Sequence, residues 1–465
     1  MTSKLSFLFA AKILFMTSLF AQDSFKSDSR IFHQKNPSEI NPHTEKIILT
    51  FVWHAGDRAD LLLKLSKEYT LKTGVEIQAI LPPLSGDYYL RIADEFKKKG
   101  PAFDLCIFDS QSLSEFASNN HLVRLNDLIK QSSKINVSDF DSAALKLYAE
   151  YPENSGNIYA LPLNQDCMGL VYRKDLFDDP NEKSAFKQKY GYKLEVPETY
   201  DQLKDIAEFF TRPKQNLYGI ALYGSQDYDA CTSAFNNIFW SYGAELWDPV
   251  AGRAEGCVNS PEAKQALAYF KELFKYASPG FQNAYVSEVN NAIVSGQVAL
   301  GIQWYYYFNK FVEQTRNKKF KLSFATLPGQ KNANGNTNRF VMVGGQGISI
   351  SQYSRHKREA WKFVEWLMTK QQQWKWVEGG GMTGLAAILK DSKFLEASPA
   401  NKSFPFSMSI TKDYWHLPEY PQLLQVLQKY VHATISGTMP ANKALDRCAA
   451  EQQKILKKSV TKKDR

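Results

Sequence analysis

Short apolar runs alternate with amphipathic segments in the first part of the chain. Residues 47–53 (IILTFVW), 75–81 and 103–109 (FDLCIFD) are apolar and rich in β-branched or aromatic residues, which predicts buried strands. Residues 62–69 and 89–99 place their apolar positions on one helical face and predict helices between these strands. Strands that alternate with amphipathic helices predict an α/β fold with a largely parallel sheet.

The ends of two predicted strands are the first candidates for a binding site. Ligands of open α/β sheets bind beyond the carboxyl ends of the strands. We therefore expect residues 53–58, after the first strand, and residues 109–112, after the third, to face a ligand.

The middle and the end of the chain are richer in helical patterns. Thr199 and Gln202 have the spacing of a capping box before an apolar stripe, and Ser260–Pro261 is a second helix start. A further amphipathic stripe covers residues 360–368. The Met and aromatic members of these stripes are interpreted as core.

At both ends of the chain the amino-acid composition differs from that of an average globular protein. Residues 1–21 combine a basic start, a short apolar run and a terminal alanine, which predicts a secretory signal peptide. The polar, proline-containing residues 22–45 are expected to form a flexible leader, and residues 457–465 a frayed basic tail. No cysteine follows the expected cleavage site, so we predict an exported, soluble, periplasmic protein without a lipid anchor there.

The length and the charge narrow the class of protein. A chain of 465 residues is too long for one ordinary core, so two lobes are expected. The net charge of +9 comes largely from Lys4, Lys12 and the segment 451–465, which carries six basic and two acidic residues. The remaining charge does not support nucleic-acid binding.

Signatures of metal sites and of common enzymes are missing. The seven histidines do not fall at metal-ligand spacing, and the five cysteines form neither a zinc pattern nor a disulfide framework, although one or two bridges stay open. Gly379, Gly381 and Gly384 match G-x-G-x-x-G but follow a helical stripe instead of a strand, so a phosphate loop is not predicted. We expect no cofactor, no metal and no catalytic residue.

Carboxylates and aromatic side chains are the chemistry that remains. Asp109 and Asp166 are the best-placed carboxylates for a glycosidase pair, but each is equally suited to accept hydrogen bonds from a ligand. Trp53, Trp304 and Trp415 lie in segments that are not obviously core. Aromatic faces beside carboxylates are typical of a saccharide site.

Several short motifs, in order along the chain, resemble one family: the extracellular solute-binding proteins of ABC importers, of the large sugar-binding type that includes maltose and trehalose binders. The resemblance covers about residues 46–456. The motifs are GNIYALP at 156–162, GLVYRKDLF at 169–177, PETYDQL at 197–203, YGI at 218–220, GQVAL at 296–300 with Trp304, GG at 344–345 before ISIS at 348–351, the helix 360–367, and Gly437 before ALD at 444–446.

The resemblance implies a two-lobed periplasmic-binding-protein fold with the ligand in the cleft between the lobes. One lobe would hold residues 46–164 and 345–381, and the other residues 165–344 and 382–456. The chain would cross between them near residues 164–165, 343–344 and 381–384, and glycines at two crossings would allow a closing hinge to change its torsions.

The resemblance also implies a set of ligand contacts. Gln346 departs from the pattern, because the family often has an aromatic residue there. The expected ligand-binding residues are Trp53, Arg58, Asp109, Ser110, Asp166, Tyr223, Asn237, Trp240, Trp304, Gly344, Gly345 and Trp415.

By resemblance, the expected function is non-catalytic. A monomeric protein would capture a saccharide by lobe closure and deliver it to the transmembrane subunits of an ABC importer. Three alternatives stay open at this point: a secreted carbohydrate-active enzyme, a binder of an anionic solute such as glycerol phosphate, and a metal binder. Arg58 is the residue that leaves room for an anionic solute. The metal binder is suggested only faintly, by Tyr305, Tyr306 and Tyr307.

Overall fold

The computed structural model describes residues 46–83 and 86–463. The predicted signal peptide (residues 1–21) and the predicted leader (residues 22–45) lie outside the described residues. Within the described ranges, no helix combines the length and the apolar character needed to span a membrane.

The first elements follow the predicted alternation. They are β1 (Ile48–Val52), α1 (Asp57–Thr73), β2 (Glu76–Ile80), α2 (Gly86–Lys98) and β3 (Leu105–Asp109). β1 pairs in parallel with β2 on one side and with β3 on the other. All five residues of β3 are buried, as expected for a central strand. The three strands predicted from apolar runs are therefore confirmed.

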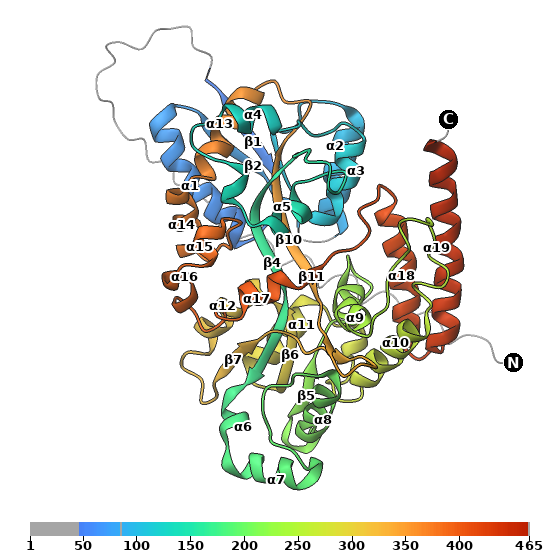
Figure 1. Ribbon diagram of the computed structural model, residues 1–465. Helices are drawn as coiled ribbons and strands as arrows, with labels where there is room; N and C mark the ends of the chain where they lie inside the picture. Colours follow the sequence, from blue (N-terminus) through green and yellow to red (C-terminus); the bar gives the residue numbers. More distant parts are fainter. Residues whose placement is uncertain (1–45, 84–85, 464–465) are drawn as a thin grey trace, which may run out of the picture. The chain divides into compact units, whose positions relative to one another are not determined.

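Two long strands continue this sheet into a second group of elements. β10 (Val341–Ile350) pairs antiparallel with β3 and with β4 (Leu161–Arg173), and the order of the main sheet is β2-β1-β3-β10-β4-β6-β5. Figure 1 shows β4 and β10 running through both groups of elements. The expectation of a largely parallel sheet was wrong from β3 onward, because strand β10, which comes late in the sequence, inserts in the opposite direction.

The second group contains three further strands and most of the central helices. Thr199 and Gln202 form the predicted capping box at the start of α8, and Ser260 caps α10 by accepting from the Ala263 amide at 3.1 Å. β6 pairs antiparallel with β4 and in parallel with β5, while β7 pairs with β4. The elements are α6 (Lys174–Asp178), α7 (Pro180–Tyr190), α8 (Tyr200–Phe210), β5 (Tyr218–Ala221), α9 (Ala230–Ser241), α10 (Pro261–Leu273), α11 (Val286–Ser295), β6 (Val298–Trp304), α12 (Tyr305–Thr315) and β7 (Leu322–Ala325).

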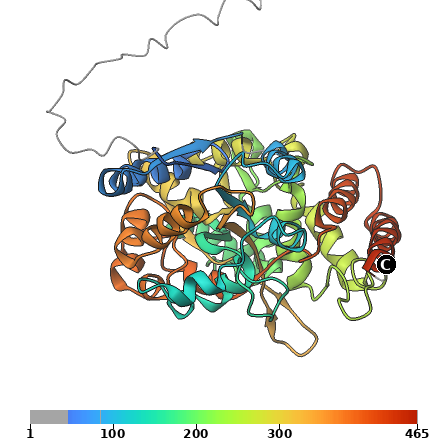
Figure 2. The same cartoon turned by 90° about the horizontal axis from the view of Figure 1, so that it is seen from above.

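The helices late in the chain divide between the two groups. α14 packs against α1, whereas α18 and α19 pair with each other and pack against α9 and α10. Figure 2 shows this red helix pair at the opposite edge from the orange helices α13 and α14. The late elements are α13 (Lys357–Leu367), α14 (Lys370–Glu378), α15 (Ala386–Leu389), α16 (Ser392–Glu396), α17 (Phe404–Ser409), β11 (Thr411–Lys412), α18 (Tyr420–Ile435) and α19 (Ala441–Lys463).

The short remaining elements complete the chain. They are α3 (Leu113–Ser118), α4 (Asn126–Gln131), α5 (Ser142–Tyr148), the hairpin of β8 (Gln330–Lys331) and β9 (Thr337–Asn338), and four 3-10 helices: η1 (Ser110–Ser112), η2 (Val137–Asp139), η3 (Pro213–Gln215) and η4 (Phe281–Asn283). The expectation of a frayed tail was wrong up to Lys463, because α19 continues as one helix to that residue.

Three segments lie side by side where the sheet passes from one group of elements to the other. Gln346 of β10 pairs with Asn164 of β4, and a bulge follows between Gln346 and Gly347. The Gln165 amide donates to the Met382 carbonyl at 3.2 Å, and the Met382 amide donates to Asn164 Oδ1 at 3.1 Å. These are the segments from which the resemblance implies chain crossings.

All five cysteines fall within the described residues, and each is a free thiol. Cys106, Cys167, Cys231 and Cys448 are buried, while Cys257 is partly exposed. The bridges that the sequence left open are absent from this part of the chain.

Candidate ligand-binding site

A cavity opens where β3, β4 and β10 meet the start of α12. It encloses about 620 Å³ of empty space, part of it open to solvent. We call it the inner pocket; its walls come from both groups of elements.

A buried ion pair forms one wall of the inner pocket. The Arg58 guanidinium, at the start of α1, donates to Asp166 Oδ2 of β4 at 3.2 Å. The Arg58 Cζ atom also lies 3.7 Å from the centroid of the Tyr306 ring. Burial raises the pKa of Asp166, and the adjacent Arg58 acts in the opposite direction.

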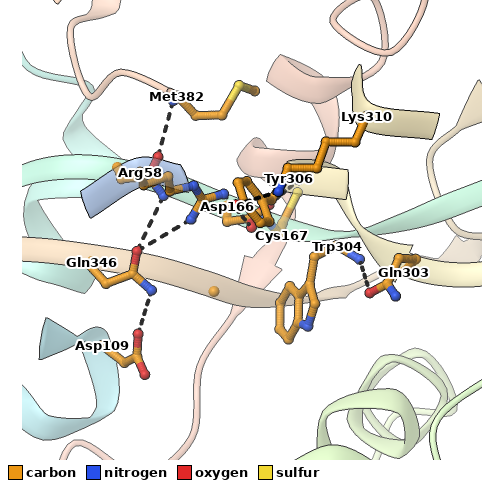
Figure 3. A network of polar contacts seen from close by, with 12 residues as sticks. Arg58, Asp109, Asp166, Cys167, Gln303, Trp304, Tyr306, Lys310, Gln346 and Met382 are labelled. Carbon is orange, nitrogen blue, oxygen red and sulfur yellow. Dashed lines mark hydrogen bonds and ion pairs between the residues drawn. The ribbon is translucent and has the colours of Figure 1, made fainter. Parts of the chain in front are cut away.

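Asp166 is fixed by more than its ion pair. Its Oδ1 accepts from the backbone amides of Cys167 at 3.0 Å and Tyr306 at 3.2 Å. Figure 3 shows this arrangement and the hydrogen bonds that extend it toward Asp109. The carboxylate therefore sits at the junction of α1, β4 and α12.

A chain of hydrogen bonds runs from this ion pair to the end of β3. Gln346 Nε2 donates to Asp109 Oδ1 at 2.6 Å, and Gln346 Oε1 accepts from Asn164 at 3.3 Å and weakly from Arg58 at 3.5 Å. The Tyr228 hydroxyl donates to the other oxygen of Asp109. Both oxygens of Asp109 thus have donors within the protein.

Trp304 supplies an aromatic surface to the inner pocket. It ends β6 and is the N-cap residue of α12, and its amide donates to Gln303 Oε1 at 2.8 Å. The ring packs against Gly344, where an added Cβ atom would lie 2.7 Å from Trp304 Cζ3. No ring of residues 46–83 or 86–463 stacks on this indole, and Figure 3 shows it apart from the hydrogen-bonded chain of Arg58, Gln346 and Asp109.

Two titratable groups of the wall have shifted pKa values. Burial raises the pKa of Asp229 to about 7, and the neighbouring charge of Asp109 adds to the shift. Burial lowers the pKa of His54, against the opposing effect of Asp109, so His54 is neutral at pH 7. At neutral pH the pocket therefore holds groups that donate hydrogen bonds and groups that accept them.

Six of the residues expected to bind ligand line the inner pocket. They come from α1, the end of β3, β4, β6 and β10, segments far apart in the sequence. The six are Arg58, Asp109, Asp166, Trp304, Gly344 and Gly345.

The other six expected residues do not line the inner pocket. All are buried: Trp53 stacks on Trp376 at 6.2 Å between ring centroids, Trp415 stacks on Tyr414 at 6.0 Å, and the Tyr223 hydroxyl donates to Gln303. The remaining three lie in elements next to the pocket and are Ser110, Asn237 and Trp240.

Asn237 has a clear structural role. Its Nδ2 donates to the Ser233 carbonyl at 2.7 Å, and its Oδ1 accepts from the Met342 amide at 2.7 Å. This side chain ties helix α9 to the start of strand β10. Its amide groups are therefore already engaged within the protein.

The structure adds pocket residues that the sequence analysis did not name as ligand contacts. His54 and Gln111 lie inside the two segments expected at the strand ends, so their position could have indicated them. Tyr228, Asp229 and Tyr285 carried no local signal. The full set is His54, Gln111, Tyr228, Asp229, Tyr285, Val286, Tyr306, Tyr307, Val343 and Gln346.

The three consecutive tyrosines separate in space. Tyr306 and Tyr307 line the inner pocket, while the Tyr305 hydroxyl donates to Ser403 Oγ at 2.7 Å, away from it. In residues 46–83 and 86–463 there is no cluster of three His, Cys, Asp or Glu side chains placed to hold a metal ion. The arrangement offers carboxylate and amide acceptors and one open indole face.

Comparison with known proteins identifies the family to which this chain belongs. Residues 55–374 match the model of the bacterial extracellular solute-binding proteins. The chain is 24% identical to the mannitol-binding protein of Pseudomonas aeruginosa, over 64% of this chain and 68% of that protein. A ribitol complex of an ABC transporter solute-binding protein from Agrobacterium radiobacter K84 has a TM-score of 0.75 and 21% identity, covering 88% of this chain and 98% of that one.

A second solved structure has the same two-lobed fold. Maltose-bound MalE3 of T. maritima has a TM-score of 0.74 and 21% identity, with 88% of this chain and 100% of that chain covered. The predicted fold class, an α/β protein of two lobes, is confirmed by these likenesses together with the mixed sheet described above. The chain belongs to the family of bacterial extracellular solute-binding proteins.

Proposed function

We propose that this protein is the non-catalytic substrate-binding component of an ABC importer and that it captures a sugar or sugar alcohol in the inner pocket. The observation that carries the proposal is the set of side chains that line the inner pocket. Three carboxylates (Asp109, Asp166 and Asp229) and the indole of Trp304 face one cavity. Carboxylates accept from hydroxyl groups, and an aromatic face packs against C–H groups.

The relatives bind solutes of this chemistry. The Pseudomonas aeruginosa protein is a mannitol-binding protein, the Agrobacterium radiobacter K84 structure is a ribitol complex, and MalE3 is bound to maltose. All three are neutral polyhydroxy compounds. A neutral ligand of many hydroxyl groups suits a wall rich in hydrogen-bond acceptors.

The charges of the pocket disfavour an anionic solute such as glycerol phosphate. Among the lining residues, Arg58 is the only Lys or Arg, against Asp109, Asp166 and Asp229. Its guanidinium already contacts Asp166 and the Tyr306 ring. A phosphate would therefore meet uncompensated negative charge.

Asp109 and Asp166, the pair that the sequence offered for a glycosidase, lack the freedom that such an enzyme needs. Asp166 accepts from Arg58 and two backbone amides, and Asp109 accepts from Gln346 and Tyr228. A general acid must hold a proton near the scissile bond, and a nucleophile must reach the sugar. Carboxylates engaged by internal donors suit ligand orientation better than turnover.

We propose that the two groups of elements are lobes that close on the ligand. Residues 46–164 and 345–381 belong to the first lobe, and residues 165–344 to the second. The Asp141 amide donates to the Gly384 carbonyl, and Lys393 pairs with Glu378, so we extend the first lobe to about residue 396. The rest, to residue 456, completes the second lobe.

The expected context is export and delivery. We propose that residues 1–21 direct export to the periplasm, where a monomer meets the transmembrane subunits of an importer. Ligand would act by shifting the population from an open to a closed arrangement of the lobes.

A thermal-shift screen of residues 22–465 tests this function. The panel contains monosaccharides, disaccharides, sugar alcohols, glycerol phosphate and divalent metal ions, each at millimolar concentration. A ligand at about 1,000 times its dissociation constant adds about 4 kcal/mol to the native state. A shift with a sugar or a sugar alcohol that is recovered unchanged is the expected result; a shift with only glycerol phosphate or a metal ion would contradict the proposal.

A further inference from the structure

Tyr228 stands between two cavities. It lines the inner pocket and also a second cavity, the outer groove, which encloses about 1530 Å³ of empty space including open solvent. It is the only residue of the described chain that lines both. The outer groove lies between α2 on one side and α18 on the other, with Tyr89, Tyr420 and Lys429 among its walls.

Three contacts hold Tyr228 in this position. Its hydroxyl donates to Asp109 at the end of β3, and it accepts weakly from Gln111 Nε2 at 3.5 Å. Its carbonyl accepts from Gln428 Nε2 of α18. The side chain therefore bridges from the loop before α9 to β3.

The backbone of Tyr228 adopts a conformation that side chains of this type rarely take. Its φ is 45°, in the left-handed region that favours glycine. Such a conformation is unfavourable for an aromatic residue and persists only where the surroundings enforce it. The ring is held in place at an energetic cost, which points to a role beyond packing.

Because Tyr228 is the residue of the described chain that lines both cavities, its ring is the side chain placed to separate them. The outer groove offers aromatic and polar side chains (Tyr89, Tyr420, Gln425 and Glu451) that suit further hydroxyl-bearing units. A saccharide of several units would need both spaces, whereas a single sugar ring or a short sugar alcohol needs only the inner pocket.

We propose that Tyr228 is the size-determining residue of the site: it closes the inner pocket against the outer groove and restricts the ligand to one sugar unit or an acyclic sugar alcohol. This inference rests on the proposed function. It places the specificity for length in one side chain and the specificity for hydroxyl groups in the carboxylates of the inner pocket. Asp109 connects the two, because it accepts both from Tyr228 and from Gln346.

The test compares four forms of the protein by isothermal titration calorimetry. Y228G removes the ring and suits the positive φ, so the variant should fold. Y228F keeps the ring and loses only the hydroxyl. N216G introduces glycine at another left-handed position (φ 52°), outside both cavities, and controls for a backbone change alone. The ligands are glucose, ribitol, mannitol, maltose, maltotriose and maltotetraose.

We expect the wild-type protein and N216G to bind at least one of glucose, ribitol and mannitol, and to bind maltotriose and maltotetraose at least tenfold more weakly. Y228F loses the donor to Asp109 and should bind every ligand more weakly, but it keeps the ring and should keep this ratio. In Y228G this ratio should fall at least tenfold. A wild-type protein that binds maltotetraose as tightly as the small solutes would overturn the size limit and leave the proposed function standing. An unchanged ratio in Y228G would overturn the role of Tyr228, and an absence of binding to every sugar and sugar alcohol would overturn both.

Discussion

The indole of Trp304 lies on a residue without a side chain. An added Cβ atom at Gly344 would lie 2.7 Å from the ring, so the glycine lets the indole pack on the backbone of β10. One face of the binding wall therefore depends on two residues from different strands, β6 and β10.

W304A should weaken binding of the sugar or sugar alcohol found by the thermal-shift screen by roughly 30-fold, about 2 kcal/mol, because the stacking face is lost. W304F should recover part of the affinity. W247A is the matched control, since Trp247 is partly buried and does not line the inner pocket. Calorimetric affinities of W304A and W247A that agree would contradict the stacking role.

The second residue-scale prediction concerns Asp229. Burial raises its folded pKa to about 7 from the ordinary value of 3.8. The folded protein therefore binds a proton that the unfolded chain releases, and this stabilisation is full below about pH 3.8 and is lost as the pH rises through about 7. Melting temperatures of wild type and D229N between pH 5 and pH 8 measure it. We expect the wild type to lose a few degrees more than D229N over this range; parallel curves would contradict the assignment.

At the scale of elements, β4 and β10 carry the site because their backbones approach closely. Gly345 has a φ of +89°, and an added Cβ atom there would lie 2.3 Å from the Asn164 carbonyl oxygen and 2.7 Å from the Asp166 amide nitrogen. The pairing that places Asp166 therefore requires glycine at this position, both for the torsion and for the space.

G345A should reduce the free energy of unfolding by at least about 2 kcal/mol more than G74A does. Gly74 also has a positive φ, +75°, but no atom lies within 4 Å of an added Cβ, so G74A isolates the torsional cost of about 1 kcal/mol. Urea unfolding of both variants measures the difference. Equal losses would mean that the close approach of β4 and β10 carries no cost.

At the scale of the whole molecule, contacts between α1 and the second group of elements differ in burial. The Arg58–Asp166 pair is buried, with 6% of each side chain exposed. The Asp57–Lys310 pair also joins α1 to α12 but leaves the Asp57 side chain 69% exposed. Buried and exposed pairs contribute very differently to stability.

R58Q leaves the Asp166 carboxylate without its cation and should cost about 3 kcal/mol in urea unfolding. K310Q breaks the exposed pair between α1 and α12 and should change stability by less than about 1 kcal/mol. Equal losses of stability in the two variants would contradict the prediction that breaking the buried pair costs more than breaking the exposed one.

Local patterns determined much of this fold. The strands of the first group were predictable because apolar β-rich runs are bounded by polar turns, and the helices α8 and α10 because their caps have fixed spacing. The direction of β10 was not predictable, since pairing between residues more than 100 positions apart leaves no local periodicity. The tail was misjudged because its charge composition does not reveal that α19 continues to Lys463.

The residues of the candidate site, like the elements of the fold, were only partly predictable from the sequence. Arg58, Asp109, Asp166 and Trp304 were predictable because each stands at the end of a recognisable element or motif. Trp53, Tyr223, Asn237, Trp240 and Trp415 were expected at the ligand but lie buried outside the inner pocket, because sequence alone does not distinguish an aromatic or amide side chain in a wall from one in the core. The glycines at 381 and 384 allow close packing instead of a special torsion: added Cβ atoms would lie 2.2 Å from Trp376 and 2.6 Å from Pro162.

By itself, the sequence determined the family, the α/β alternation and the chemical groups available for binding, because these depend on short motifs and residue types. Only the tertiary structure decided which of those groups share one cavity. The Asp109 oxygens meet Gln346 and Tyr228 from 237 and 119 positions along the chain. Contacts of that range follow from strand order and lobe packing, and no local pattern encodes them.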